Sequence, residues 1–176
     1  TTNSGRYYLR EISVPDGYLI EQSVIPVEFT YENQFIAWQI VDCLHSDKQT
    51  TVEIDKRAFT ADSDGTFALP GATLTVTDWN GNMVDTWESC DTAHVIRGLH
   101  LSHDFAGNRD TTKIYTLSET RPADGYTTAR SIQFRLEQAT GDNSYLQETT
   151  VWVLHESEDA EYQSGSIISP IAFSDD

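Results

Sequence analysis

The chain has 176 residues, of which 11 are basic and 28 acidic, and its formal net charge at pH 7 is −17. Such acidity disfavours nucleic-acid phosphates and anionic membranes as partners. No apolar run approaches the length that spans a bilayer, and no basic-then-apolar signal segment opens the sequence, so we do not expect membrane insertion. A chain of this length fits one domain and part of another.

Short alternating runs rich in Val, Ile, Thr and aromatic residues dominate the chain, and Asp-Gly, Asn-Gly and Pro-Gly pairs separate them. This pattern predicts an all-β fold, and the spacing of the runs favours an immunoglobulin-like β-sandwich. The predicted strands are Tyr7–Ile12, Ile25–Tyr31, Phe35–Val41, Thr51–Ala58, Thr73–Asp78, Met83–Glu88, His94–Arg97, Lys113–Thr120, Ser131–Glu137 and Thr150–His155. Between two of them, Trp79–Asn82 predicts a two-residue hairpin turn.

A motif that ends in Asp-Gly-Tyr occurs twice, as Tyr7–Tyr18 and as Tyr115–Tyr126. Glu11 and Glu119 occupy the same position in the two copies. In each copy, alternation puts the carboxylate on the same strand face as a tyrosine and a leucine. The repetition predicts a tandem array of modules.

Lys56 follows Val52 and Ile54 in strict alternation, so a lysine shares a strand face with two β-branched residues. Burying an unpaired ammonium or carboxylate costs too much free energy to occur without compensation. An inward lysine and an inward Glu119 therefore predict a buried ion pair or chemistry between them. An ordinary lysine on an edge strand is the alternative.

Several separated elements occur in an order that resembles a known module: the Lys56 strand, Leu69–Leu74, the strand ending at Trp87, and Tyr115–Tyr126. The resemblance is to the collagen-adhesin B-type (SpaA-type, prealbumin-like) domain of Gram-positive pilins and surface adhesins. It covers Thr51 to about His155, and it implies a prealbumin-like β-sandwich.

The resemblance implies three parts in the chain. Residues 1–48 would be the C-terminal part of one module, which we call the first unit. Residues 49–158 would be the complete module, and residues 159–176 a tail or an extra strand. Ser46–Gln49, polar and turn-like, marks the expected junction.

In such modules a lysine attacks an Asn or Asp on the last strand with help from a Glu, which yields an intramolecular isopeptide bond. The resemblance thus implies Lys56 as nucleophile, Glu119 and Glu11 as proton shuttles, and Asp42 and His155 at the acceptor positions. An apolar environment favours a neutral amine and a proton-donating acid. Imidazole has no carbonyl carbon, so His155 is not expected to react unless Glu156 or Asp159 substitutes. The lysine that serves Glu11 and Asp42 would lie outside these residues.

Other groups suggest weaker sites. Cys43 and Cys90 permit one disulfide in an oxidising compartment, with two free thiols as the alternative. His100 and His103 lie near Asp104, but no third zinc ligand is evident. Asp62–Gly65 resembles half of a calcium loop without its closing Glu and is better interpreted as a turn. We therefore expect no metal and no cofactor.

The sequence as a whole predicts an extracellular stalk segment of a cell-wall-attached adhesin or pilin-like protein, with neighbouring repeat modules as partners. No catalytic constellation is evident, so apart from a single self-modifying turnover we do not expect an enzyme. The alternative is an adhesive module that binds host matrix protein or glycan. Trp79 and Trp152 are the candidates for exposed rings that stack on sugars, because Trp38 and Trp87 are expected to face inward or end a strand.

Overall fold

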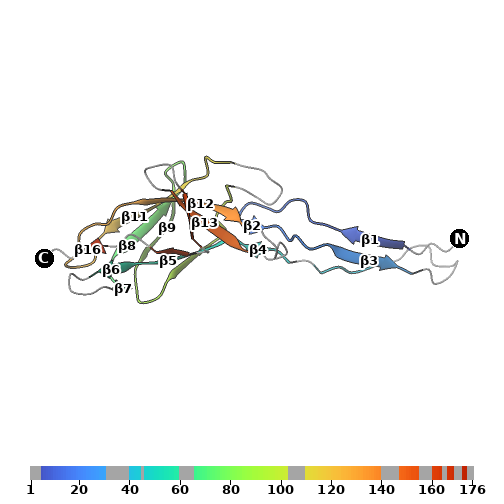
Figure 1. Ribbon diagram of the computed structural model, residues 1–176, viewed down its shortest axis with the longest axis horizontal. Helices are drawn as coiled ribbons and strands as arrows, with labels where there is room; N and C mark the ends of the chain where they lie inside the picture. Colours follow the sequence, from blue (N-terminus) through green and yellow to red (C-terminus); the bar gives the residue numbers. More distant parts are fainter. Residues whose placement is uncertain are drawn as a thin grey trace.

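The computed structural model describes residues 5–30, 40–44, 46–59, 66–102, 110–139, 147–154, 160–163, 166–168 and 172–173 (Figure 1). Every regular element among them is a β-strand. The strands are β1 Gly5–Leu9, β2 Tyr18–Leu19, β3 Ile25–Phe29, β4 Lys48–Gln49, β5 Thr51–Asp55, β6 Arg57–Phe59, β7 Thr66–Ala68, β8 Thr73–Thr77, β9 Met83–Glu88, β10 His94–Arg97, β11 Tyr115–Arg121, β12 Ile132–Gln138, β13 Thr149–Leu154, β14 Ala160–Gln163, β15 Ser166–Ile168 and β16 Ala172–Phe173. Within the described ranges, therefore, no helix is long and apolar enough to cross a membrane.

The complete module is built from two main sheets, and the all-β prediction is confirmed. One sheet has the strand order β14-β13-β12-β11-β8-β9 and the other β10-β5-β15. Alternate residues of both sheets enter one core, because successive side chains of a strand point to opposite faces. The buried members of this core are Val52, Ile54, Leu74, Val76, Ile96, Leu99, Tyr115, Leu117, Phe134, Leu136 and Val151.

Two predicted strands have the bounds that the sequence indicated, while one turn differs. β9 and β10 begin and end where the alternation predicted. The hairpin between β8 and β9 is wider than a two-residue turn, because Thr77 pairs with Met83. In this wider turn a carboxylate oxygen of Asp78 accepts the backbone N–H groups of Asn80 and Asn82, at 2.9 and 2.8 Å. An Asx-type turn has replaced the expected tight hairpin.

The first unit extends from one end of the sandwich as a two-stranded ribbon of β1 and β3 (Figure 1). The ribbon is antiparallel, with Tyr7 opposite Val27 and Leu9 opposite Ile25. Where it meets the complete module, β2 pairs with β4. The segment expected to be a junction turn thus contains a short strand that ties the two parts together. Figure 1 shows β1 and β16 at opposite ends of the long axis.

The tail forms edge strands on the complete module. β14 pairs with β13 antiparallel, whereas β15 and β16 run parallel to β5 and β6. Ile167 lies opposite Ile54 in that register. The tail therefore covers the edge of the strand pair that flanks Lys56, which would otherwise present unpaired backbone groups.

Candidate functional site

Lys56 lies between β5 and β6, and its side chain is fully buried. The alternation that brings it inward also buries Val52 and Ile54. The Lys56 carbonyl oxygen accepts the backbone N–H of Leu69 at 2.9 Å, which fixes the backbone at this point. The inward lysine that the sequence predicted is thus present.

Glu119 lies on β11, and its side chain is fully buried beside Lys56. The Nζ atom of Lys56 lies 3.0 Å from Oε1 of Glu119, the direct approach that the sequence predicted. The other oxygen, Oε2, accepts the backbone N–H of Ala129 at 2.5 Å. Charges removed from water need this kind of pairing and additional hydrogen bonding. The arrangement can serve as a buried ion pair or hold an amine beside a group that moves protons.

The acceptor end of this site lies outside the described residues. β13 ends at Leu154. His155, which occupies the acceptor position but is not expected to react, and its possible substitutes Glu156 and Asp159 follow it outside the described residues. The strand itself has the expected alternation, with Val151 and Val153 buried. The roles assigned to these three residues therefore stay predictions.

The corresponding site in the first unit is more open. Glu11 is only partly buried, and its Oε2 accepts the backbone N–H of Glu21 at 2.6 Å. Asp42 is exposed, and its neighbour Ile40 is 71% exposed, so neither faces a core in this structure. Residues 40–44 form no strand, and most of the predicted strand Phe35–Val41 lies outside the described residues.

The cysteine and metal predictions can be compared with the structure in part. Cys43 and Cys90 are both free and exposed, so the alternative of two thiols holds here. The Nδ1 atom of His100 lies 3.4 Å from Oδ2 of Asp16. His103, Asp104 and Asp62–Gly65 lie outside the described residues. The part of the chain that the structure describes contains no cluster of three or more His, Cys, Asp or Glu side chains able to hold a metal ion.

The tryptophans differ from the expected exposed platform. Trp79 is half-buried, and the Nζ atom of Lys113 lies 3.9 Å from the centroid of its ring. Trp152 is also half-buried. Trp87 stacks on His94 with ring centroids 4.1 Å apart. Neither sugar-binding candidate is therefore the exposed ring that the sequence predicted, and Lys113 lies over the ring of Trp79.

Sequence reasoning missed a second role for the repeated glutamates. Both carboxylates bind a backbone N–H ten positions further along the chain. The repeated position of the glutamates could have suggested a shared local contact. Strand alternation, however, does not predict which backbone N–H donates to a given side chain. Also missed was Gln138, whose amide binds the backbone of Ile20 from 118 positions away.

Comparison with known proteins reveals similarity to solved structures only, since the sequence matches no established family profile and no curated protein. The TIE protein of Bacillus anthracis is 18% identical over 97% of this chain, with a TM-score of 0.46. The pilus adhesin SpaC of Lactobacillus rhamnosus GG is 16% identical over 97%, also with a TM-score of 0.46. The shaft pilin SpaA of the same organism is 14% identical over 72%, with a TM-score of 0.45.

SpaC is a pilus adhesin and SpaA a shaft pilin, and this chain resembles both of them and the TIE protein at low identity. It spans 25% of the length of the TIE protein and of SpaC, and 51% of SpaA. All three TM-scores are below 0.5, so these similarities do not assign a role to this chain.

Proposed function

We propose that this chain is a stalk segment of an extracellular, cell-wall-attached adhesin or pilin-like protein. Residues 1–48 would close one module, residues 49–158 would form the next, and residues 159–176 would cover its edge. The main support is the buried pair that Lys56 forms with Glu119 of the repeated motif. In addition, the units of the molecule follow one another along one axis (Figure 1). A stalk of this kind holds a binding tip away from the cell surface and is not an enzyme.

The chemistry proposed for the site is a single amide-forming step. The neutral amine of Lys56 would attack a side-chain carboxyl carbon, Glu119 would pass protons, and one water would leave as the C–N bond forms. His155 offers no such carbon. In the complete module we therefore propose that packing and the ion pair act without a covalent bond. In the first unit, Asp42 would be the acceptor and Glu11 the shuttle for a lysine from another segment.

Intact mass spectrometry tests this proposal directly. The purified chain should have the mass of its sequence. Loss of one water would show that a lysine amine has condensed with a carboxyl group, with Glu156 and Asp159 as the expected acceptors, and would overturn the unlinked assignment. His155→Asp should then restore the bond and lose one water. The double variant with Glu119→Gln is the matched control and should keep its full mass, because the proton shuttle has been removed.

The adhesive alternative has less support in the described residues. Sugar-binding modules need open aromatic faces, and Lys113 lies over the ring of Trp79. We therefore propose repeat modules as the partners of this segment. Binding assays on glycan and matrix-protein arrays should show no specific signal for the isolated chain, and a saturable signal would favour the adhesive function.

A further inference from the structure

The two copies of the motif end in turns of the same shape. In the first turn, Pro15–Tyr18, the N–H of Tyr18 donates to Pro15 at 3.2 Å; in the second turn, Ala123–Tyr126, the N–H of Tyr126 donates to Ala123 at 3.1 Å. Gly17 and Gly125 both have φ of +82°, a conformation that favours glycine. After each turn, a backbone N–H ten residues beyond the glutamate donates to the carboxylate of Glu11 or Glu119.

The two turns have the same backbone conformation, but the first is packed against other residues and the second is open to solvent. Gly17 is buried, and a Cβ atom placed on it would overlap the carbonyl oxygen of Gly98. Around Gly125 such an atom would meet nothing within 4 Å. The residues that follow the turns differ accordingly, since Leu19 and Ile20 are buried whereas Thr127 and Thr128 are exposed.

The complete module presents backbone and hydroxyl groups that receive the first turn. The N–H of Thr50 donates to the Gly17 carbonyl oxygen at 2.9 Å, and the Thr50 hydroxyl donates to Leu99 at 2.6 Å. The Thr50 carbonyl oxygen in turn accepts the N–H of Gly98 at 3.0 Å. The fully buried Thr50 thus links the first turn to the loop after β10.

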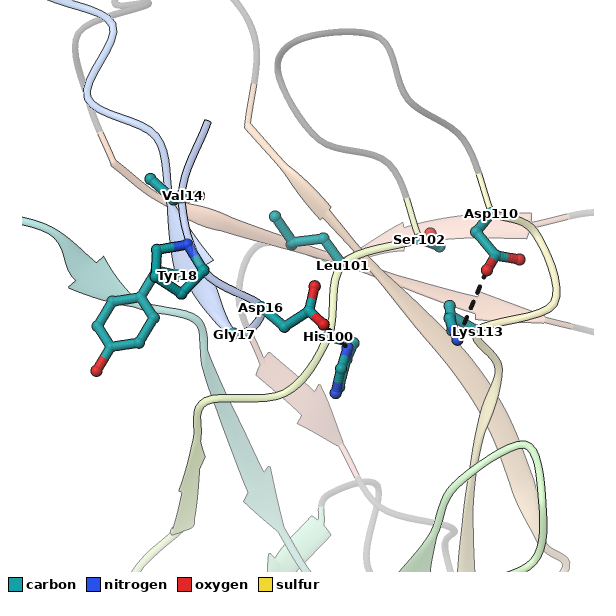
Figure 2. A pocket seen from close by; sticks show the side chains of 10 residues that line it. Val14, Asp16, Gly17, Tyr18, His100, Leu101, Ser102, Asp110 and Lys113 are labelled. Atoms are coloured by element: carbon teal, nitrogen blue, oxygen red, sulfur yellow. Dashed lines mark ion pairs between the residues drawn. The ribbon is translucent and has the colours of Figure 1, made fainter. Parts of the chain in front are cut away.

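Gln138 completes this receiving surface from the end of β12. Its Nε2 donates to the Ile20 carbonyl oxygen at 2.8 Å, and its Oε1 accepts the Ile20 N–H at 3.0 Å. The side chain is buried, so an unmade hydrogen bond here would be costly. Figure 2 shows the same junction from its pocket side, where Asp16 of the turn points toward His100.

We propose that Gly17–Ile20 is a docking element through which one unit of the array binds the next module in a fixed orientation. The receiving surface is formed by Thr50, Gly98 and Gln138. It fits a partner unit whose motif continues from Asp-Gly-Tyr into two apolar residues. The second turn continues into two threonines and lacks this feature. The docking does not involve Lys56, so it is independent of any covalent bond.

Two alanine variants of the full chain separate docking from simple backbone strain. Gly17→Ala and Gly125→Ala place the same side chain at the same φ, and only the first creates a clash with the complete module. Gly125→Ala is expected to lower the Tm by about 3 °C through strain, and Gly17→Ala by about twice that shift or more. Equal shifts would overturn the proposal.

Hydrogen exchange tests the selectivity of the receiving surface. Leu19→Thr with Ile20→Thr copies the second turn into the first and should speed exchange of the Ile20 and Thr50 amides ~10-fold or more. Thr127→Leu with Thr128→Ile is the matched control and should leave those amides unchanged. Should the threonine variant fail to fold, Gln138→Met removes both hydrogen bonds to Ile20 at a similar side-chain volume and should give the same faster exchange. Unchanged protection of Ile20 would contradict the proposal.

Discussion

The tyrosine and leucine of the repeated motif are buried in β11 and exposed in β1. Tyr115 and Leu117 are 1% and 0% exposed, whereas their counterparts Tyr7 and Leu9 are 60% and 51% exposed. In the complete module Val52 and Ile54 of the opposite sheet pack on this face. Within the described residues of the first unit, β3 is the single strand paired with β1. The motif therefore determines which side chains share one face of a strand. Whether that face is buried depends on a covering strand elsewhere in the sequence.

The largest effect should come from breaking the buried charge pair. Lys56→Ala leaves the Glu119 carboxylate buried without its ammonium partner, so we expect a loss of about 3–5 kcal/mol in the free energy of unfolding, or roughly 10 °C in Tm. Thermal denaturation measures this shift. Glu11→Gln in the first unit is the counterpart and should change the Tm little, because Glu11 is partly exposed and glutamine can still accept the Glu21 N–H.

A double variant sharpens that result. Lys56→Met with Glu119→Gln removes both charges while leaving an acceptor for the Ala129 N–H, and it should recover most of the lost stability. If Lys56→Ala alone shifted the unfolding free energy by less than about 1 kcal/mol, the pair would not be the main electrostatic contact of the site.

The next largest difference is expected between the leucines of the two motif copies, in how much each contributes to stability. Leu117→Ala creates a cavity in a closed core and is expected to destabilise the chain by about 2–5 kcal/mol. Leu9→Ala alters a half-exposed side chain and should stay within about 0.5 kcal/mol of the parent. Urea denaturation compares the two. A large effect of Leu9→Ala would mean that β1 is covered in solution.

Alkaline pH should destabilise the chain through Tyr115 of the motif. Burial raises the pKa of Tyr115 to about 12. The folded chain therefore keeps a proton that the unfolded chain releases near pH 10, so stability should fall as pH rises from about 10 to 12. Melting temperatures against pH measure this fall. Tyr115→Phe should flatten it.

The smallest effect is expected at the surface of the ribbon. Arg6 pairs with Glu28 across β1 and β3, but both side chains are more than half exposed. Water and salt screen such a pair, so Arg6→Ala should give no resolvable change in Tm at about 0.15 M salt. A clear drop would indicate that this cross-strand pair organises the ribbon.

Period-two alternation predicted the site well because it is a local property. It placed Val52, Ile54 and Lys56 on one face and Glu119 on another, and the sandwich brought the two faces together. The pattern could not identify what covers β1, because the covering strand of a sandwich lies far away in sequence.

Short and distant pairings escaped sequence reasoning for physical reasons. β2 and β4 contain two residues each, too few to display any period. The Gln138–Ile20 contact joins an amide to a backbone group across most of the chain. The parallel tail strands β15 and β16 pair with the exposed edges of β5 and β6. Such edges exist only once the sheets have formed, so no local pattern predicts this pairing.

The arrangement of β1 and β16 at opposite ends of the long axis sets how tension would reach the fold (Figure 1). A pull along that axis would act nearly parallel to the strands of the β1–β3 ribbon. The two strands would then be sheared past one another, so the hydrogen bonds between them would have to break together. A pull across the ribbon would instead break these hydrogen bonds one after another. At the junction, the same load would pass from Gly17 through Thr50 into β5, a route made of backbone hydrogen bonds and buried side chains.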